Sequence, residues 1–202
     1  MKRFILLLAL AIPAGAHAQP ARLSAAERAT YDSLRAGVLA GDTTLDYGAL
    51  RALYARIPDD GKPSPGEAFQ RAKAATDSLV RRAILDTILT AYAGHVRAHR
   101  DVGRLFASLG DSARASQEAA IVRAFVRSIA STDGTSPETA MLVWNIAEEY
   151  AVMESLGATK EISQALLDAK TSRGDEAFDV LTGKTDGGKS VTLYFRLGWW
   201  KK

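Results

Sequence analysis

The sequence predicts an α+β protein, in which an N-terminal bundle of about five helices packs on a small C-terminal antiparallel sheet with one helix. Two observations carry this prediction. Apolar residues recur three and four positions apart through residues 22–131, which is the spacing of one helix face. Residues 132–202 instead contain short β-like runs separated by turn formers. We expect a single domain over residues 19–202, because this length supports one core.

Residues 1–18 have the pattern of a secretory signal peptide. Lys2 and Arg3 give it a positive start, and residues 4–12 form an apolar run that is too short to span a bilayer. The segment ends in Ala-His-Ala, which is a small-x-small cleavage site. We therefore expect export to the periplasm or to the extracellular space, with a mature chain that begins near Gln19.

The composition narrows the class of protein. Of the 202 residues, 47% are hydrophobic, which allows a sizeable core, and none is cysteine, so packing must stabilise the fold without disulfide bonds. The net charge of +3 falls to +1 without residues 1–18, because this segment holds two cations and no acid. A balanced mature chain argues against a nucleic acid as partner. The remaining apolar runs are too short for a membrane span.

The first part of the chain predicts three helices. A capping-box pattern at Ser24 begins the first helix, and Gly41 is its expected end. The second helix carries an apolar face over residues 47–57 and ends at the proline that follows. A loop is expected over residues 59–63, and the third helix begins with a proline at its first position in residues 64–67.

Three further helices are expected before residue 131. Residues 77–92 show a helical pattern with apolar residues four positions apart. In the next pair of helices, Gly103, Phe106, Gly110 and Ala115 resemble the small-aromatic-turn-small spacing of a tetratricopeptide-type hairpin. Small residues at these positions let two antiparallel helices approach closely. No second copy of the pattern lies one repeat length away, so we expect one helical hairpin and no solenoid.

The C-terminal region predicts strands and one helix. Three short runs predict strands: residues 162–167, 177–182 and 191–197. An Asp-Gly-Gly sequence at residues 186–188 predicts a hairpin turn between the last two strands. Residues 148–156 are more typical of a helix that stops at Gly157. Residues 141–147 are rich in large apolar side chains, and periodicity alone does not separate strand from helix there.

Four short motifs carry a resemblance: Asp-Gly-Thr-Ser-Pro-Glu-Thr-Ala at residues 133–140, Glu-Glu-Tyr at 148–150, Leu-Gly at 156–157 and Leu-Tyr-Phe at 193–195. Together they resemble a family of secreted bacterial proteins that is defined only as a domain of unknown function. The resemblance covers most of the mature chain, and it favours a strand at residues 141–147. It implies no activity, no ligand and no catalytic residue.

Residues 183–190 match the phosphate-binding loop of P-loop nucleotide-binding proteins letter for letter. That loop must be followed by a helix, whose first amide groups bind the phosphates. Here Ser190 leads directly into a predicted strand. We therefore interpret the match as a hairpin turn, and we expect no nucleotide and no other cofactor.

His95 and His99 are the candidates for a metal site. They lie four residues apart, which places both rings on one face of a helix. A zinc site needs at least a third ligand, which Glu148 or Glu149 could supply only if the fold brings it close. In the alternative interpretation, His99 packs as a large ring against the partner helix of the hairpin. We favour this interpretation and predict no metal site.

The candidate binding residues lie in the densest cluster of turn formers, hydroxyl groups and carboxylates, and in the acidic pair that follows it: Asp133, Ser136, Glu138, Thr139, Glu148, Glu149 and Tyr150. Such groups could bind a ligand or a cation. The same residue types also form turns and helix caps. The sequence has no cysteine nucleophile and no serine in a nucleophile elbow, so we predict no catalytic residue.

Two functional hypotheses follow. In the first, the protein is an exported, non-catalytic binding protein that contacts an unknown protein or small ligand at the junction of bundle and sheet, with residues 133–139 lining that junction. In the second, it is a periplasmic hydrolase that uses carboxylates near Glu138 and Glu148, with Glu149 or His99 as further acid–base groups. A hydrolase requires these groups to converge in one cleft.

Overall fold

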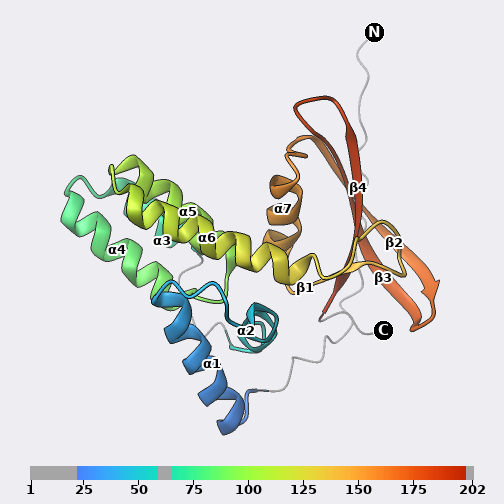
Figure 1. Ribbon diagram of the computed structural model, residues 1–202, viewed down its shortest axis with the longest axis horizontal. Helices are drawn as coiled ribbons and strands as arrows, with labels where there is room; N and C mark the ends of the chain where they lie inside the picture. Colours follow the sequence, from blue (N-terminus) through green and yellow to red (C-terminus); the bar gives the residue numbers. More distant parts are fainter. Residues whose placement is uncertain (1–21, 59–64, 199–202) are drawn as a thin grey trace.

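A computed structural model describes residues 22–58 and 65–198 (Figure 1). The expected signal peptide at residues 1–18 and the expected loop at residues 59–63 lie outside the described residues. Within them the chain forms seven helices and one four-stranded sheet, with the sheet at the C-terminal end. The predicted α+β class is therefore confirmed.

The helical region comprises six helices in the described residues: α1 (Ala25–Leu39), α2 (Tyr47–Tyr54), α3 (Pro65–Ala74), α4 (Ser78–Ala91), α5 (Val96–Ser108) and α6 (Ser112–Ile129). The sheet region comprises β1 (Met141–Val143), α7 (Ile146–Ser155), β2 (Lys160–Thr171), β3 (Gly174–Lys184) and β4 (Ser190–Leu197). Each of these six helices lies where the sequence predicts one, in agreement with a bundle of about five helices.

Local signals in the sequence begin and end the first helices as expected. The Ser24 side chain accepts a hydrogen bond from the amide of Glu27, and the Glu27 carboxylate accepts one from the amide of Ser24, which is a complete capping box. Gly41, just after α1, has a φ of +86°, a conformation that glycine adopts without strain. The Asp77 carboxylate caps α4 through the amides of two residues in its first turn.

The predicted helical hairpin is formed by α5 and α6, which lie side by side (Figure 1). A Cβ atom on Gly103 would lie only 3.0 Å from the Cβ of Glu118 on α6, so the glycine permits this close approach. Phe106 is fully buried between the helices and their neighbours. Gly110 makes the tight turn with a φ of +73°.

The sheet has the strand order β1-β4-β3-β2. The pairs β2–β3 and β3–β4 are antiparallel, as predicted, and β2 and β3 extend well beyond the predicted residues 162–167 and 177–182. β1 pairs with β4 in parallel, with Met141 opposite Phe195, so the sheet is mixed. The sequence analysis predicted an antiparallel sheet and did not predict this parallel pair. The two strands are separated in the chain by α7, β2 and β3, and parallel strands need such a long connection.

The segment 141–147, for which a strand was favoured, divides in two. Only Met141–Val143 is a strand, and α7 begins at Ile146. Glu148 and Glu149 lie in the first turn of α7, where carboxyl groups favour a helix start.

The P-loop-like segment is the hairpin between β3 and β4. The Thr185 amide donates to the carbonyl of Lys189 over 2.9 Å, and Gly188 turns the chain with a φ of +77°. A strand follows the turn, which is the structure expected from the sequence.

Helix α7 joins the two regions of the fold, since it lies against one face of the sheet and beside α6 (Figure 1). Val152 and Met153 of α7 pack in one core cluster with Leu181 and Phe195 of the sheet. Gly183 permits the close approach, because a Cβ there would lie 2.7 Å from the carbonyl oxygen of Ala158. The side chains at the start of α7 are thereby fixed between bundle and sheet.

Candidate functional site

The polar side chains of residues 133–139 bond mainly within their own loop. The Asp133 carboxylate accepts hydrogen bonds from the amide and the hydroxyl of Thr135, each over 3.0 Å. Hydrogen bonds from Thr139 and Thr135 hold the pKa of Asp133 below its ordinary value. The hydroxyl groups of Ser136 and Thr139 lie 3.1 Å apart and bond to each other. These groups serve the turn that the Asp-Gly and Ser-Pro pairs indicate.

Glu138 fastens this loop to the turn between β2 and β3. Its carboxylate accepts hydrogen bonds from the amide of Ser172 over 2.7 Å and from the Ser172 hydroxyl over 2.9 Å. The Arg173 guanidinium donates to the carbonyl oxygens of Glu138 and Pro137, both over 3.0 Å. The bonds from Ser172 lower the pKa of Glu138. These bonds join the loop at residues 133–139 to the turn between β2 and β3. Glu138, a candidate binding residue, therefore has a structural role.

Glu148 forms a buried ion pair with Arg51 of α2. Two nitrogens of Arg51 donate to the two carboxylate oxygens over 2.9 and 2.7 Å. The Arg51 guanidinium also donates to the carbonyl of Leu142, and the amide of Trp144 donates to Glu148. Because both side chains are at most 3% exposed, this pair is part of the interior.

Glu149 points into the interior from the same turn of α7. Its side chain is fully buried, and its carboxyl group faces the side chain of Asp179. Burial, together with the charge of nearby Asp179 on β3, raises the pKa of Glu149 to about 8. Tyr150 is half-buried and packs against the core cluster between α7 and the sheet.

His99 is a buried structural histidine. Its Nδ1 lies 2.7 Å from a carboxylate oxygen of Glu118, and its Nε2 lies 2.9 Å from the carbonyl oxygen of Ala93. Both ring nitrogens therefore face hydrogen-bond acceptors. His95 is the residue before the first turn of α5, not a member of the same helix face. Over residues 22–58 and 65–198, no three His, Cys, Asp or Glu side chains are grouped so that they could hold a metal ion.

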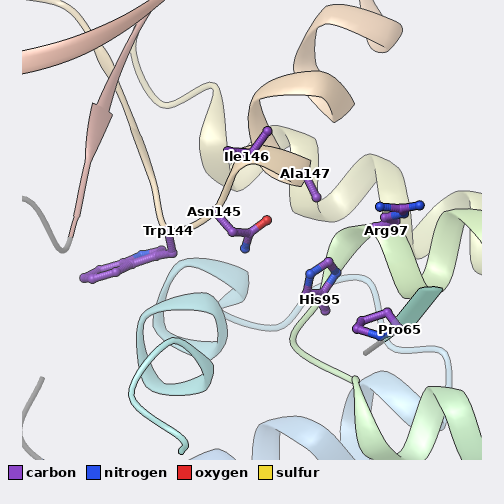
Figure 2. A pocket seen from close by; sticks show the side chains of 7 residues that line it. All are labelled: Pro65, His95, Arg97, Trp144, Asn145, Ile146 and Ala147. Atoms are coloured by element: carbon purple, nitrogen blue, oxygen red, sulfur yellow. The ribbon is translucent and has the colours of Figure 1, made fainter. Parts of the chain in front are cut away.

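A pocket of about 410 Å³ lies where the helical region meets the start of α7 (Figure 2). It receives side chains from the start of α3, from the start of α5 and from the connection between β1 and α7. Its lining residues are Pro65, His95, Arg97, Trp144, Asn145, Ile146 and Ala147. The volume lies within the range of about 300–1000 Å³ that is usual for small-molecule sites.

Two polar atoms in the wall of this pocket have no partner. The Nδ1 of His95 and the Oδ1 of Asn145 are both buried and lack a hydrogen bond within the described chain. Asn145 precedes α7 without capping it through its side chain. An unpaired buried polar group costs about 1–3 kcal/mol, so natural folds retain few of them. Two residues of the pocket lining thus each keep a buried polar atom that no other described residue satisfies.

His95 is uncharged at neutral pH. Burial, together with the nearby positive charges of Arg97 and Arg100, lowers its pKa to about 4. A neutral imidazole can donate or accept through Nδ1, depending on its tautomer.

The structure does not gather the sequence-predicted candidates in one place. Glu138 bonds to the turn between β2 and β3, Glu148 to α2, and His99 to α6. The expected junction between bundle and sheet does hold a pocket, but its walls come from other residues than 133–139. Among the residues that line the pocket, only His95 was a candidate from the sequence, and it was considered there as a metal ligand.

The residues that sequence reasoning missed are Arg97, Trp144 and Asn145. One signal was present, since Asn145 is a favoured helix-start residue directly before the acidic first turn of a helix. No local pattern indicates that Asn145 would leave its side-chain oxygen unpaired beside His95.

Comparisons of this chain with protein-family models, with curated proteins and with solved structures find no match. The resemblance to a secreted bacterial family therefore stays a prediction. No helix in the described part of the chain is long and apolar enough to cross a membrane.

Proposed function

We propose that this protein is an exported, non-catalytic binding protein that takes a small ligand into the junction pocket. The observation that carries the proposal is the pocket of about 410 Å³ at the junction, two of whose lining residues, His95 and Asn145, each have a buried polar atom without a partner among the described residues. A ligand toward which these side chains turn would remove the cost of leaving the two atoms unpaired. The export part of the proposal rests on the signal-peptide pattern of residues 1–18.

The state of the acid–base groups supports a non-catalytic function. A general acid or base must reach the proton that it transfers, directly or through one water. Glu149 and His99 are at most 1% exposed, and Glu148 is bonded to Arg51. Glu138 is exposed but bonds to Ser172 at another place in the fold. The hydrolase hypothesis gains no support from these contacts.

A fragment screen tests the proposal. Ligand-observed NMR would compare the wild-type protein with the variant Ile146→Trp, in which a bulky side chain stands at the pocket wall. Ile146 is 55% exposed, so the larger side chain does not have to enter the core. Leu156→Trp is the matched control, because Leu156 is 48% exposed just after α7 and does not line the pocket.

The proposal predicts fragments that bind to the wild type and to Leu156→Trp but not to Ile146→Trp. A library of anionic, neutral and cationic fragments keeps this test independent of ligand class. If no fragment binds in this pattern while both variants keep the wild-type melting temperature, the junction pocket is not a ligand site.

A further inference from the structure

The described part of the chain buries six side chains of the Asp, Glu, His or Arg types, and they form three pairs. The pairs are Arg51–Glu148, His99–Glu118 and Glu149–Asp179. In the first two pairs, an acid meets a base. In the third, two acids face each other, one from the first turn of α7 and one from β3. Glu149 and Asp179 are 0% and 8% exposed, so this acid pair lies in the interior.

No cation of the described helices neutralises the acid pair. The charges that act on Glu149 are those of Asp179 and Glu148, and both are negative. Arg51 of α2 is the buried cation at the start of α7, and it donates to both carboxylate oxygens of Glu148. Its charge is therefore already balanced.

The charged side chains of α5 and α6, which lie beside α7, have other partners or are exposed. His99 of α5 lies against the Glu118 carboxylate of α6. Arg100 of α5 pairs with Glu154 near the other end of α7. The arginines at positions 123 and 127 of α6 are exposed.

The described sheet adds no cation on the face that carries Asp179. This residue lies opposite Phe195 of β4 and Leu166 of β2. Because side chains alternate between the two faces of a strand, the residues two positions away share this face. These residues are Gln164, Asp168, Ala177, Leu181, Leu193 and Leu197, and β1 is apolar throughout. The one charged side chain among them, Asp168, is another acid.

Two carboxyl groups that face each other in the interior cannot both be ionised, because neither water nor a cation screens their repulsion. One of them keeps its proton and donates it to the other in a hydrogen bond. Burial, the charge of Asp179 and the hydrogen bond with Asp179 raise the pKa of Glu149 to about 8. The proton is therefore present at neutral pH, and it belongs to the pair as a unit.

We propose that Glu149 and Asp179 share one proton, which fastens the first turn of α7 to β3 and releases it when the surroundings become alkaline. The neighbouring Glu148 fastens the same turn to α2 through Arg51. Loss of the shared proton leaves two carboxylates that repel each other and attract water, whereas the ion pair keeps both of its charges. Of the two attachments of α7, the one to the sheet is therefore sensitive to pH. This inference does not depend on a ligand in the junction pocket.

The direction of the pH dependence follows from the state that holds the proton. When α7 separates from β3, Glu149 meets water and returns to its ordinary pKa of 4.5, whereas in the closed contact its pKa is about 8. Between these two pH values, opening releases a proton. The equilibrium constant for opening therefore increases about tenfold per pH unit in this range. Below pH 4.5 both states keep the proton, and above pH 8 both states have lost it.

A titration of the carboxyl carbons tests whether the proton is shared. ¹³C NMR would follow Cδ of Glu149 and Cγ of Asp179 in the folded protein from pH 4 to pH 9.5. We expect both signals to move in a common step near pH 8. In Asp179→Asn the step of Glu149 should fall by about one pH unit or more, because the facing negative charge is gone. An unchanged step in this variant, or a wild-type step of Glu149 near pH 4.5, would overturn the inference.

Hydrogen exchange tests whether the proton fastens α7. Exchange rates would be compared between the wild type and Glu149→Gln, which keeps the size of the side chain without an ionisable group. The ratio of the two rates at one pH removes the ordinary acceleration of exchange by base. At the amides of residues 149–152, this ratio should rise about tenfold per pH unit between pH 6 and pH 7.5. In the wild type these amides should also exchange faster than the most protected amides of α5, which report global unfolding.

Glu154→Gln is the matched control for this comparison. Glu154 lies on the same helix, but its side chain is 34% exposed and pairs with Arg100. This variant should keep the wild-type carbon titration and the wild-type exchange at residues 149–152. If the ratio for Glu149→Gln does not change with pH, or if residues 149–152 exchange only as slowly as α5, the shared proton does not fasten α7 and the inference fails.

Discussion

Arg51 and Glu148, 97 positions apart in the sequence, form a doubly hydrogen-bonded ion pair in the interior, where α2 meets the start of α7. Arg51 also donates a hydrogen bond to the carbonyl of Leu142 in β1, and the Glu148 carboxylate accepts a hydrogen bond from the amide of Trp144. The pair thereby fixes the connection between β1 and α7, which forms one wall of the junction pocket.

Removing one partner of this pair should destabilise the fold strongly. Glu148→Gln leaves the buried Arg51 guanidinium without a counter-charge, which typically costs about 3–5 kcal/mol. Urea unfolding at pH 7 measures the loss. The double variant Arg51→Met with Glu148→Leu should lose clearly less than the sum of its two single variants, because no unpaired charge is left. A loss below about 1 kcal/mol for either single variant would contradict the assigned role of the pair.

Stability should fall between pH 4.5 and about 8 because of Glu149. In the folded state its pKa is raised to about 8, so the folded protein holds a proton that the unfolded chain has released above its ordinary pKa of 4.5. Stability from this group is complete below pH 4.5 and is lost as the pH rises towards 8. Glu149→Gln, which stays neutral, should be more stable than the wild type at pH 8, on the order of 2–4 kcal/mol.

The measurement for Glu149 is a series of urea unfolding curves from pH 4 to pH 9. The difference in free energy of unfolding between variant and wild type should increase over this range. A difference that does not change with pH would show that the carboxyl group is ionised in the fold throughout.

His95 should make the stability of the fold depend on pH in the opposite direction, and at lower pH than Glu149 does. Its pKa in the fold is lowered to about 4 from 6.5, so the unfolded chain takes up a proton that the folded protein does not. The stability from this group is complete above pH 6.5 and is lost as the pH falls towards 4. His95→Phe should therefore lose less stability than the wild type between pH 6.5 and pH 4, as thermal melting across that range would measure. Parallel melting profiles of the two proteins would refute a buried, neutral His95.

Glu138 should stabilise the turn between β2 and β3 and should not affect ligand binding at the junction pocket. Glu138→Ala removes the acceptors of the Ser172 amide and hydroxyl. Hydrogen exchange in the turn between β2 and β3 should therefore become several-fold faster, because this turn loses its attachment to the loop. Fragment binding at the junction pocket should not change. Lost binding with an unaltered turn would instead support the earlier hypothesis that residues 133–139 form the binding site.

The elements of the fold were predictable where the signal is local. The capping box at Ser24, the glycine turn at Gly110 and the hairpin turn at residues 186–188 each follow from a few neighbouring residues. The boundary within residues 141–147 was missed because three apolar residues of β1 run directly into a helix start, and periodicity needs a longer segment to separate them.

The site was predictable only in its general location. The expected junction between bundle and sheet holds the pocket, but its walls combine residues from three separate parts of the chain. Glu148 looked like a ligand-binding carboxylate, and only the distant Arg51 makes it an interior ion pair. Unpaired atoms such as Asn145 Oδ1 result from tertiary packing, for which the sequence carries no local pattern.

The most direct test of the central claim is to map a fragment hit from the screen onto the protein by its ¹H–¹⁵N chemical shifts. If the junction pocket is the ligand site, the largest shifts fall on the amides of Ile146 and Ala147 and on the ring of His95. Shifts concentrated on residues 133–139, with the amides of α7 unchanged, would contradict the account.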